Sequence, residues 1–152
     1  MSEPNTDPMF ATLRNVIDRA DPVPQAVVEA ARAAYTWRTI DAELAELAAD
    51  SAMATTGVRS TSAPRLLTFE GAGAGVEVEV EVAQTGSTRH LSGQLVPMGA
   101  AQITVRWSSG SQETTADDLG RFAMDHVPAG SVSLAILREG TEQPIVTSWI
   151  SI

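Results

Sequence analysis

The chain has 152 residues, 43% of them apolar, so it is long enough to bury a hydrophobic core. Its formal net charge of −9 argues against general nucleic-acid binding, which needs a basic surface to neutralise phosphates. The chain has no cysteine, and all ten basic residues are arginines. These absences exclude thiol catalysis, thiolate zinc sites and lysine-based Schiff-base chemistry, and no cofactor is expected.

The first eight residues, Met-Ser-Glu-Pro-Asn-Thr-Asp-Pro, are polar and are expected to form a flexible tail over 1–8. They have neither the positive charge nor the apolar run of a signal peptide. The chain also has no apolar stretch near the roughly 20 residues that a membrane helix needs. Because cysteine is absent as well, we expect a cytoplasmic protein.

Residues 9–50 have the apolar periodicity of helices. A first helix is expected over 9–19, and the sequence Asp-Pro-Val-Pro at 21–24 ends it because proline lacks a backbone N–H. A second, alanine-rich helical stretch is expected over 24–50, either continuous or broken near Asp41, which could be an N-cap. Together they predict an N-terminal helical hairpin.

Residues 51–63 are rich in Ser, Thr, Ala and Gly and are expected to be a linker. From residue 64 onward the apolar period changes to two. The clearest strand is 75–83, where valines alternate with glutamates. Further strands are expected at 65–70, 90–96, 101–107, 112–116, 121–125, 131–138 and 145–152. This pattern predicts an antiparallel, Ig-like or transthyretin-like β-sandwich of seven to eight strands over 64–152, and an α+β protein by content.

Four short runs carry a family resemblance. They are Ser-Gly-Gln-Leu-Val-Pro at 92–97, Ala-Gln-Ile-Thr-Val-Arg at 101–106, Thr-Ala-Asp-Asp-Leu-Gly-Arg-Phe at 115–122 and Val-Pro-Ala-Gly-Ser-Val-Ser-Leu-Ala at 127–135. In this order they resemble the carboxypeptidase regulatory-like (transthyretin-like) β-sandwich. The resemblance implies a fold and says little about function, because such domains are appended to many proteins.

The turn at 117–120 can also be interpreted from its residues alone. An aspartate at this place can cap backbone N–H groups, and Gly120 can supply a positive φ. Asp117 and Asp118 do not have the alternating ligand spacing of an EF-hand calcium loop. The turn is therefore expected to be structural.

A second resemblance covers more of the chain. The runs at 21–24, 33–47, 65–70 and 93–97 are similar to a group of small actinobacterial proteins encoded beside extracytoplasmic-function sigma factors and caspase-like CHAT proteins. This resemblance implies a regulatory role, such as holding or releasing the sigma factor or connecting it to the protease. The His-x3-Cys-x2-Cys motif of zinc-binding anti-sigma factors is absent, so that mechanism is not implied.

Two groups of residues are candidates for binding a partner protein. The first is an aromatic and apolar cluster whose members would lie on a helix, where they would either pack on the sandwich or anchor the helix in a partner's groove. The second is a strip of glutamates on one strand face, which is either solvated or docks a basic partner. The helical cluster consists of Tyr35, Trp37, Arg38, Ile40 and Leu44, and the acidic strip consists of Glu77, Glu79 and Glu81.

Catalysis is not expected. The two histidines, His90 and His126, are not accompanied by a nucleophile elbow or by a close-spaced metal-ligand motif. We therefore expect a non-catalytic adaptor that binds protein, with a sigma factor or a caspase-like protease as its partner. Two alternatives remain open: a ligand- or carbohydrate-binding sandwich, using Trp107 and Trp149, and a protease substrate cleaved within 51–63.

Overall fold

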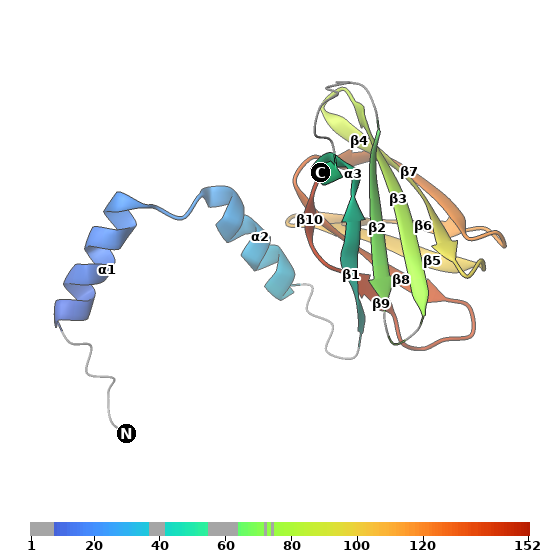
Figure 1. Cartoon of the computed structure of the whole chain (residues 1–152), viewed down its shortest axis with the longest axis horizontal. Coiled ribbons are helices and arrows are strands. Elements are labelled where there is room, and N and C mark those ends of the chain that lie inside the picture. The colour runs from blue at the N-terminus through green and yellow to red at the C-terminus, as the bar shows by residue number, and fades with distance from the viewer. Residues whose placement is uncertain (1–7, 37–41, 55–63, 72, 74) are drawn as a thin grey trace.

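In the computed structural model, the chain is mostly β, and nine strands of one mixed sheet curl into a nearly closed barrel (Figure 1). The structure describes residues 8–36, 42–54, 64–71, 73 and 75–152. The strand order is β6-β5-β8-β9-β1-β2-β3-β4-β7, and a short tenth strand, β10, pairs with β8. The sheet is antiparallel except where β1 runs parallel to β9.

The elements follow one another with short turns through most of the barrel. The helices are α1 (Pro8–Ala20), α2 (Gln25–Thr36) and α3 (Ser51–Ala54). The strands are β1 (Glu43–Asp50), β2 (Arg65–Gly71), β3 (Val76–Thr85), β4 (Thr88–Val96), β5 (Ala101–Trp107), β6 (Gly110–Ala116), β7 (Arg121–Pro128), β8 (Ser131–Arg138), β9 (Ile145–Thr147) and β10 (Ile150–Ser151).

The core is the interior of the barrel, and period-two alternation fills it. On β3 the four valines are buried and face inward, while the three glutamates between them face outward. The same alternation places Leu67 and Phe69 of β2, and Leu91 and Leu95 of β4, inside and fully buried. The strand pattern therefore produces one continuous apolar core.

The predicted two-sheet sandwich is wrong. The expected strands from residue 65 onward form, except that the one expected over 145–152 is divided into β9 and β10, and all of them belong to one sheet. On one side, β4 pairs with both β3 and β7; on the other, β5 pairs with both β6 and β8. β1 then joins the two halves by pairing with β2 and β9. Sheet closure is a tertiary property that alternation within single strands does not encode.

The two edge strands of the sheet, β6 and β7, meet along a seam. Side chains bridge this seam: the Thr114 hydroxyl donates to the carbonyl oxygen of Ala123 at 3.1 Å, and Gln112 Nε2 donates to that of Asp125 at 3.4 Å. β6 and β7 are bridged by side-chain hydrogen bonds and not by a backbone ladder. The barrel is therefore nearly, but not fully, closed.

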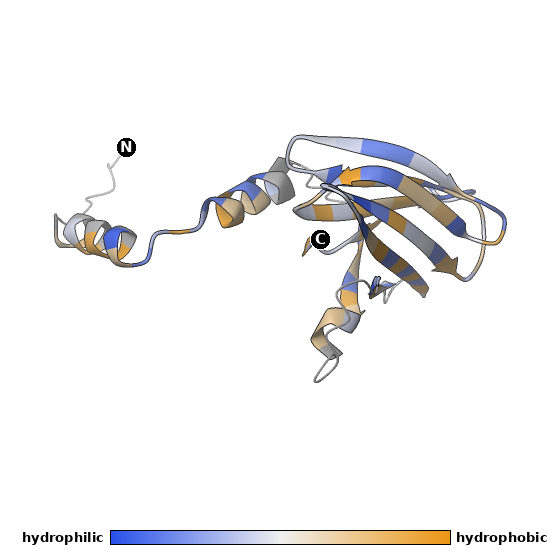
Figure 2. Ribbon diagram, turned by 90° about the horizontal axis from the view of Figure 1, so that it is seen from above, coloured by the Kyte–Doolittle hydropathy of each residue, from blue (hydrophilic) through white to orange (hydrophobic). Residues whose placement is uncertain are grey.

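The predicted helical hairpin is also wrong. Residues 43–50, expected to be helical, form strand β1, because pairing on both sides overrides the helix propensity of Glu, Leu and Ala. α1 and α2 do not fold back on each other: Figures 1 and 2 show them end to end, leading away from the sheet. One short helix, α3, lies against the barrel beside β2.

The turn between β6 and β7 has the predicted structure. The Asp117 carboxylate accepts hydrogen bonds from the backbone N–H groups of Leu119 at 3.0 Å and Arg121 at 2.9 Å. Gly120 has φ of 76°, and a Cβ there would lie 2.8 Å from the carbonyl oxygen of Leu95. The aspartate cap and the glycine expected from the sequence are both confirmed.

A close approach inside the barrel requires a glycine at residue 93. Gly93 on β4 is the direct cross-strand partner of Phe122 on β7, and the ring lies over the glycine. A Cβ at this position would lie 2.4 Å from the Phe122 ring and 2.5 Å from the carbonyl oxygen of Glu79. The ring could shift, but the backbone oxygen on β3 could not move without disturbing the ladder.

We expect Gly93→Ala to lower the free energy of unfolding by about 1–3 kcal/mol, because the new methyl group overpacks the core. Urea unfolding measures the change. Gly110→Ala is the matched control, since its Cβ would meet Trp107 at an ordinary 3.4 Å. Equal stability of the two variants would contradict this account of the Gly93–Phe122 contact.

Candidate functional site

The most exposed apolar side chains of the molecule include those on α1 and α2. Phe10 is 61% exposed, Leu13 is 51% exposed and Tyr35 is 76% exposed. Met9, Val16 and Ile17 on α1 and Val27 on α2 are also more than half exposed. In Figure 2 each helix carries both apolar and polar residues, and neither lies on the barrel. The two helices therefore present apolar side chains to solvent.

The helices are too short to be stable by themselves. α1 has 13 residues and α2 has 12, and isolated helices below about 12–15 residues are marginal in water. Most helical stability in proteins comes from packing an amphipathic face against another surface. A surface that covered these apolar side chains would therefore also stabilise the two helices.

A second feature is a group of glutamates on the outer face of β1, β2 and β3, which we call the acidic face. On β3 the Glu77 and Glu79 side chains are half-buried by their neighbours, and that of Glu81 is exposed. Neighbouring strands extend the group with two further exposed glutamates. The acidic face comprises Glu46, Glu70, Glu77, Glu79 and Glu81.

The register places like charges directly opposite one another on this face. Glu46 is the cross-strand partner of Glu70, and Glu70 is the partner of Glu77. Like charges in such pairs destabilise a sheet by a few tenths of a kcal/mol to about 1 kcal/mol each. Within the part of the chain that the structure describes, none of the five carboxylates is in an ion pair. The acidic face is therefore a concentrated negative surface that costs stability.

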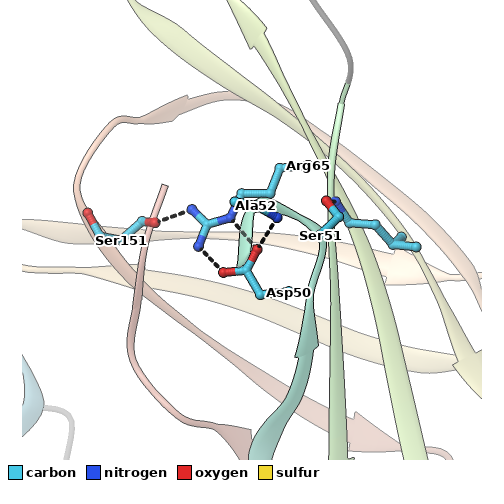
Figure 3. A network of polar contacts seen from close by, with 6 residues as sticks. Asp50, Ser51, Ala52, Arg65 and Ser151 are labelled. Atoms are coloured by element: carbon cyan, nitrogen blue, oxygen red, sulfur yellow. Dashed lines mark hydrogen bonds and ion pairs between the residues drawn. The ribbon is translucent and has the colours of Figure 1, made fainter. Parts of the chain in front are cut away.

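A third feature is a polar network at the end of β1 (Figure 3), which we call the clasp. The guanidinium of Arg65 donates two hydrogen bonds to the Asp50 carboxylate, from Nε to Oδ1 at 2.9 Å and from Nη2 to Oδ2 at 2.6 Å. Its Nη1 donates to the carbonyl oxygen of Ser151 at 2.7 Å. The clasp thus ties together the end of β1, the start of β2 and β10.

Two further bonds order the chain just after β1. The Asp50 Oδ1 atom accepts from the backbone N–H of Ala52 at 2.9 Å, and the Ser51 hydroxyl oxygen accepts from that of Leu66 at 2.8 Å. The hydrogen bonds from Arg65 hold the pKa of the Asp50 carboxyl below its ordinary value of 3.8, against the opposing effect of burial. Because the Asp50 side chain is only 8% exposed, this ion pair is better shielded from water than a surface pair.

The two histidines of the chain lie beside an irregularity in the pairing of β4 with β7. His90 Nδ1 lies 2.6 Å from Asp125 Oδ1 at a bulge between β4 and β7, where His126 has a positive φ of 62°. Across the described residues, no group of three or more His, Cys, Asp or Glu is arranged to hold a metal ion.

An open depression of about 700 Å³ lies at one end of the barrel, lined mainly by Glu43, Arg138, Glu139 and Glu142. Arg138 Nη2 donates to the carbonyl oxygen of Pro97 at 3.1 Å, so this guanidinium holds the loop before β5. The lining combines these charged side chains with Val76 and Ile145, and the depression is open to solvent.

The structure divides the first predicted group of partner-binding residues between two elements. Tyr35 lies on α2 and is exposed, whereas Leu44 lies on β1 and is 53% exposed. Trp37, Arg38 and Ile40 lie outside the described residues. The predicted acidic strip of Glu77, Glu79 and Glu81 is on the outer face of β3.

Sequence reasoning missed the extension of the acidic strip and the clasp. The alternation of β2 could have pointed to Glu70, because it places residues 66, 68 and 70 on the outer face. Glu46 and Asp50 were hidden because residues 43–50 were expected to be helical. The pairing of Asp50 with Arg65 has no signal in a single sequence.

Comparisons of the chain with protein-family models, with curated proteins and with solved structures find no match. Within the described residues, no helix is long and apolar enough to cross a membrane. The functional argument therefore rests on the chain's own residues.

We expect Asp50→Asn to lower the free energy of unfolding at pH 7 by about 1–2 kcal/mol, because an amide cannot accept both guanidinium bonds. The lowered pKa of Asp50 means that its contribution is present above pH 3.8 and disappears as the pH falls through the folded-state pKa. The stabilities of wild type and variant should therefore converge in acid.

Urea unfolding between pH 7 and pH 3 measures both effects. Asp118→Asn, at an exposed position in the β6–β7 turn, is the control and should follow wild type at every pH. A constant difference between wild type and Asp50→Asn across this range would contradict the role given to the Asp50 carboxylate.

Proposed function

We propose that the protein is a non-catalytic adaptor of the cytoplasm that binds another protein through α1 and α2. The observation that carries the proposal is the exposure of the apolar side chains on both helices, such as Leu13 and Ile17. Amphipathic helices of this kind bind by laying their apolar face into a groove of the partner, with anchors at helical spacing. The barrel is then the folded body from which the helices are presented.

The acidic face would also contribute to binding of the partner protein. Opposed glutamates that cost stability lie together on one face, where they would attract a basic surface and steer its approach. Such steering acts mainly on the association rate and weakens as salt screens the charges. The partner we propose therefore has both an apolar groove and a basic surface.

The sequence resemblance makes two proteins the first to test as partners. One is an extracytoplasmic-function sigma factor, whose DNA-binding surface is basic, and the other is a caspase-like CHAT protease. In either case the adaptor would act by occupying a surface of its partner and would need no chemistry of its own.

We expect the double substitution Leu13→Asp and Ile17→Asp to weaken partner binding at least about tenfold, because two charges would enter the apolar contact. Isothermal titration calorimetry of the purified chain with each candidate partner measures the affinity. Arg19→Gln is the control, since it also makes the chain more negative by one charge and helical spacing places residue 19 on the opposite side of α1 from Ile17. Wild-type binding with a negative heat-capacity change would support burial of the apolar face.

The double variant should unfold at the same temperature as wild type, because both residues lie outside the barrel core. Two results would contradict the proposal: neither candidate partner binds the wild-type chain, or the double variant binds as tightly as wild type.

Neutralising the acidic face should slow association. We expect the triple variant Glu77→Gln, Glu79→Gln and Glu81→Gln to reduce the association rate constant about three- to tenfold at low salt, with little change in dissociation. The difference should vanish at high salt, which stopped-flow fluorescence can follow. The control is Glu113→Gln on β6, which removes one exposed charge elsewhere. A triple variant with an unchanged salt dependence would show that this face does not meet the partner.

A further inference from the structure

β1 is a strand whose sequence favours another structure. Its residues, Glu-Leu-Ala-Glu-Leu-Ala-Ala-Asp, include three alanines, two leucines and two glutamates, which are strong helix formers, and no β-branched residue. The neighbouring strands β2 and β3 contain the aromatic and β-branched residues typical of sheets. Local propensity and tertiary structure are thus in conflict at β1, and such conflict lowers the stability of the element.

β1 also buries little of its own surface. Ala45 is its only fully buried residue, and Leu47 remains 38% exposed although its cross-strand partner Phe69 is fully buried. The opposed pair Glu46 and Glu70 adds repulsion between β1 and β2. The free energy that holds β1 in place therefore comes mainly from backbone pairing and from the clasp.

The pairing of β1 is uneven along its length. Five residues pair with β2, with a register shift between Leu47 and Ala49. Only residues 43–45 pair with β9. Two further backbone bonds join β1 to the same segment: Glu43 N–H donates to the carbonyl oxygen of Pro144 at 3.0 Å, and Ser148 N–H donates to that of Ala45 at 2.9 Å. Beyond Ala45 the C-terminal chain departs to pair with β8 as β10, and the side chain of Arg65 reaches across to Ser151. β1 is therefore held on both sides at one end and mainly on one side at the other.

Long connections join β1 to the rest of the chain. Residues 37–42 separate it from α2, and residues 51–64 separate it from β2, whereas an antiparallel pair can be joined by about two residues. We call the place of β1 between β9 and β2 the slot. No tight hairpin joins β1 to β2 at this slot. An identical β1 from another copy could reach it.

The slot fits the protein's own β1 better than an arbitrary strand. Ala45 lies opposite Gly71 and is fully buried, so a larger side chain at this place would have to displace its neighbours. At the other end of β1, the Asp50 carboxylate accepts the two hydrogen bonds from Arg65. A strand that takes the place of β1 therefore needs a small residue and, five positions later, an aspartate.

From these features we infer that β1 is an exchangeable strand. It leaves the slot between β9 and β2 while the other strands stay paired, and β1 of a second copy of the chain takes its place. The product is a strand-swapped dimer in which every contact of β1 is recovered between copies. Because α1 and α2 precede β1, each barrel then holds the helices of its partner, and one assembly presents two sets of helices. This inference does not depend on the identity of any other partner.

The absence of cysteine allows a direct test with new thiols on the full chain. One preparation carries Glu46→Cys on β1, and a second carries Glu70→Cys on β2; these residues are direct cross-strand partners. The two are mixed under native, mildly oxidising conditions, and disulfide-linked dimers that contain one chain of each kind are quantified by mass spectrometry. Only exchange of β1 between copies places the two thiols in register.

The matched control mixes Glu70→Cys with Glu77→Cys, which are also direct partners but lie on β2 and β3. We expect at least about tenfold more mixed dimer from the first mixture than from this control, with a yield that rises with concentration. The double variant Glu46→Cys with Glu70→Cys in one chain checks that the disulfide forms in this register. If it forms there and the two mixtures give equal yields, β1 does not exchange.

Hydrogen exchange of the wild-type chain gives an independent reading. Amides of β1 should open with a smaller free energy than those of β3 and β4, because β1 detaches by itself. Equal protection of β1 and β3 would also overturn the inference. Neither experiment uses another protein, so their failure would leave the proposed binding through α1 and α2 standing, and failure of partner binding would leave the strand exchange standing.

Discussion

The barrel depends on the insertion of β1 between β9 and β2. Without this strand the sheet would be two separate runs, β6-β5-β8-β9 and β2-β3-β4-β7, and Phe69 would lose its cross-strand neighbour Leu47. The clasp between Asp50, Arg65 and Ser151 fastens β1 at the end where the C-terminal chain no longer pairs with it. The strand that joins the two runs thus contributes a single fully buried residue, Ala45, to the core, and we infer from this combination of features that β1 is exchangeable.

The surface properties of the molecule are divided between its two parts. The barrel buries most of its apolar residues and carries the acidic face outside, whereas the large apolar residues of α1 and α2 are mostly exposed. A stable folded body with exposed amphipathic helices has the properties of a binding protein, because the helices gain both burial and order when they dock. Exchange of β1 would add a second effect, since two sets of helices on one dimer raise the effective concentration at a partner with two sites.

The sequence predicts the strands well and their assembly poorly. Alternation of Val and Glu located β3, and the Asp117 and Gly120 turn was predicted in detail, since both features depend on neighbouring residues. The change from sandwich to barrel depends on which strands pair over long distances. β1 was missed because its alanines and leucines favour a helix, and only its pairing with β2 and β9 makes it a strand.

The candidate site shows the same division. Glu77, Glu79 and Glu81 could be placed on one face from their spacing, but Glu46 and Glu70 join them only through the register of three strands. Leu44 was expected to belong to the helical cluster, but it lies on β1. Residues on one element can be grouped from sequence, whereas groups that span elements need the fold.

The central claim is that α1 and α2 are the surface that meets another protein. The most direct test is an NMR titration of the isotope-labelled chain with the purified sigma factor and, separately, with the caspase-like protease. The account predicts that with one of them the resonances of residues 8–36 shift first and most, those of the acidic face shift less, and those of β5 and β8 stay in place. Shifts confined to the barrel, with the helices unaffected, would contradict it.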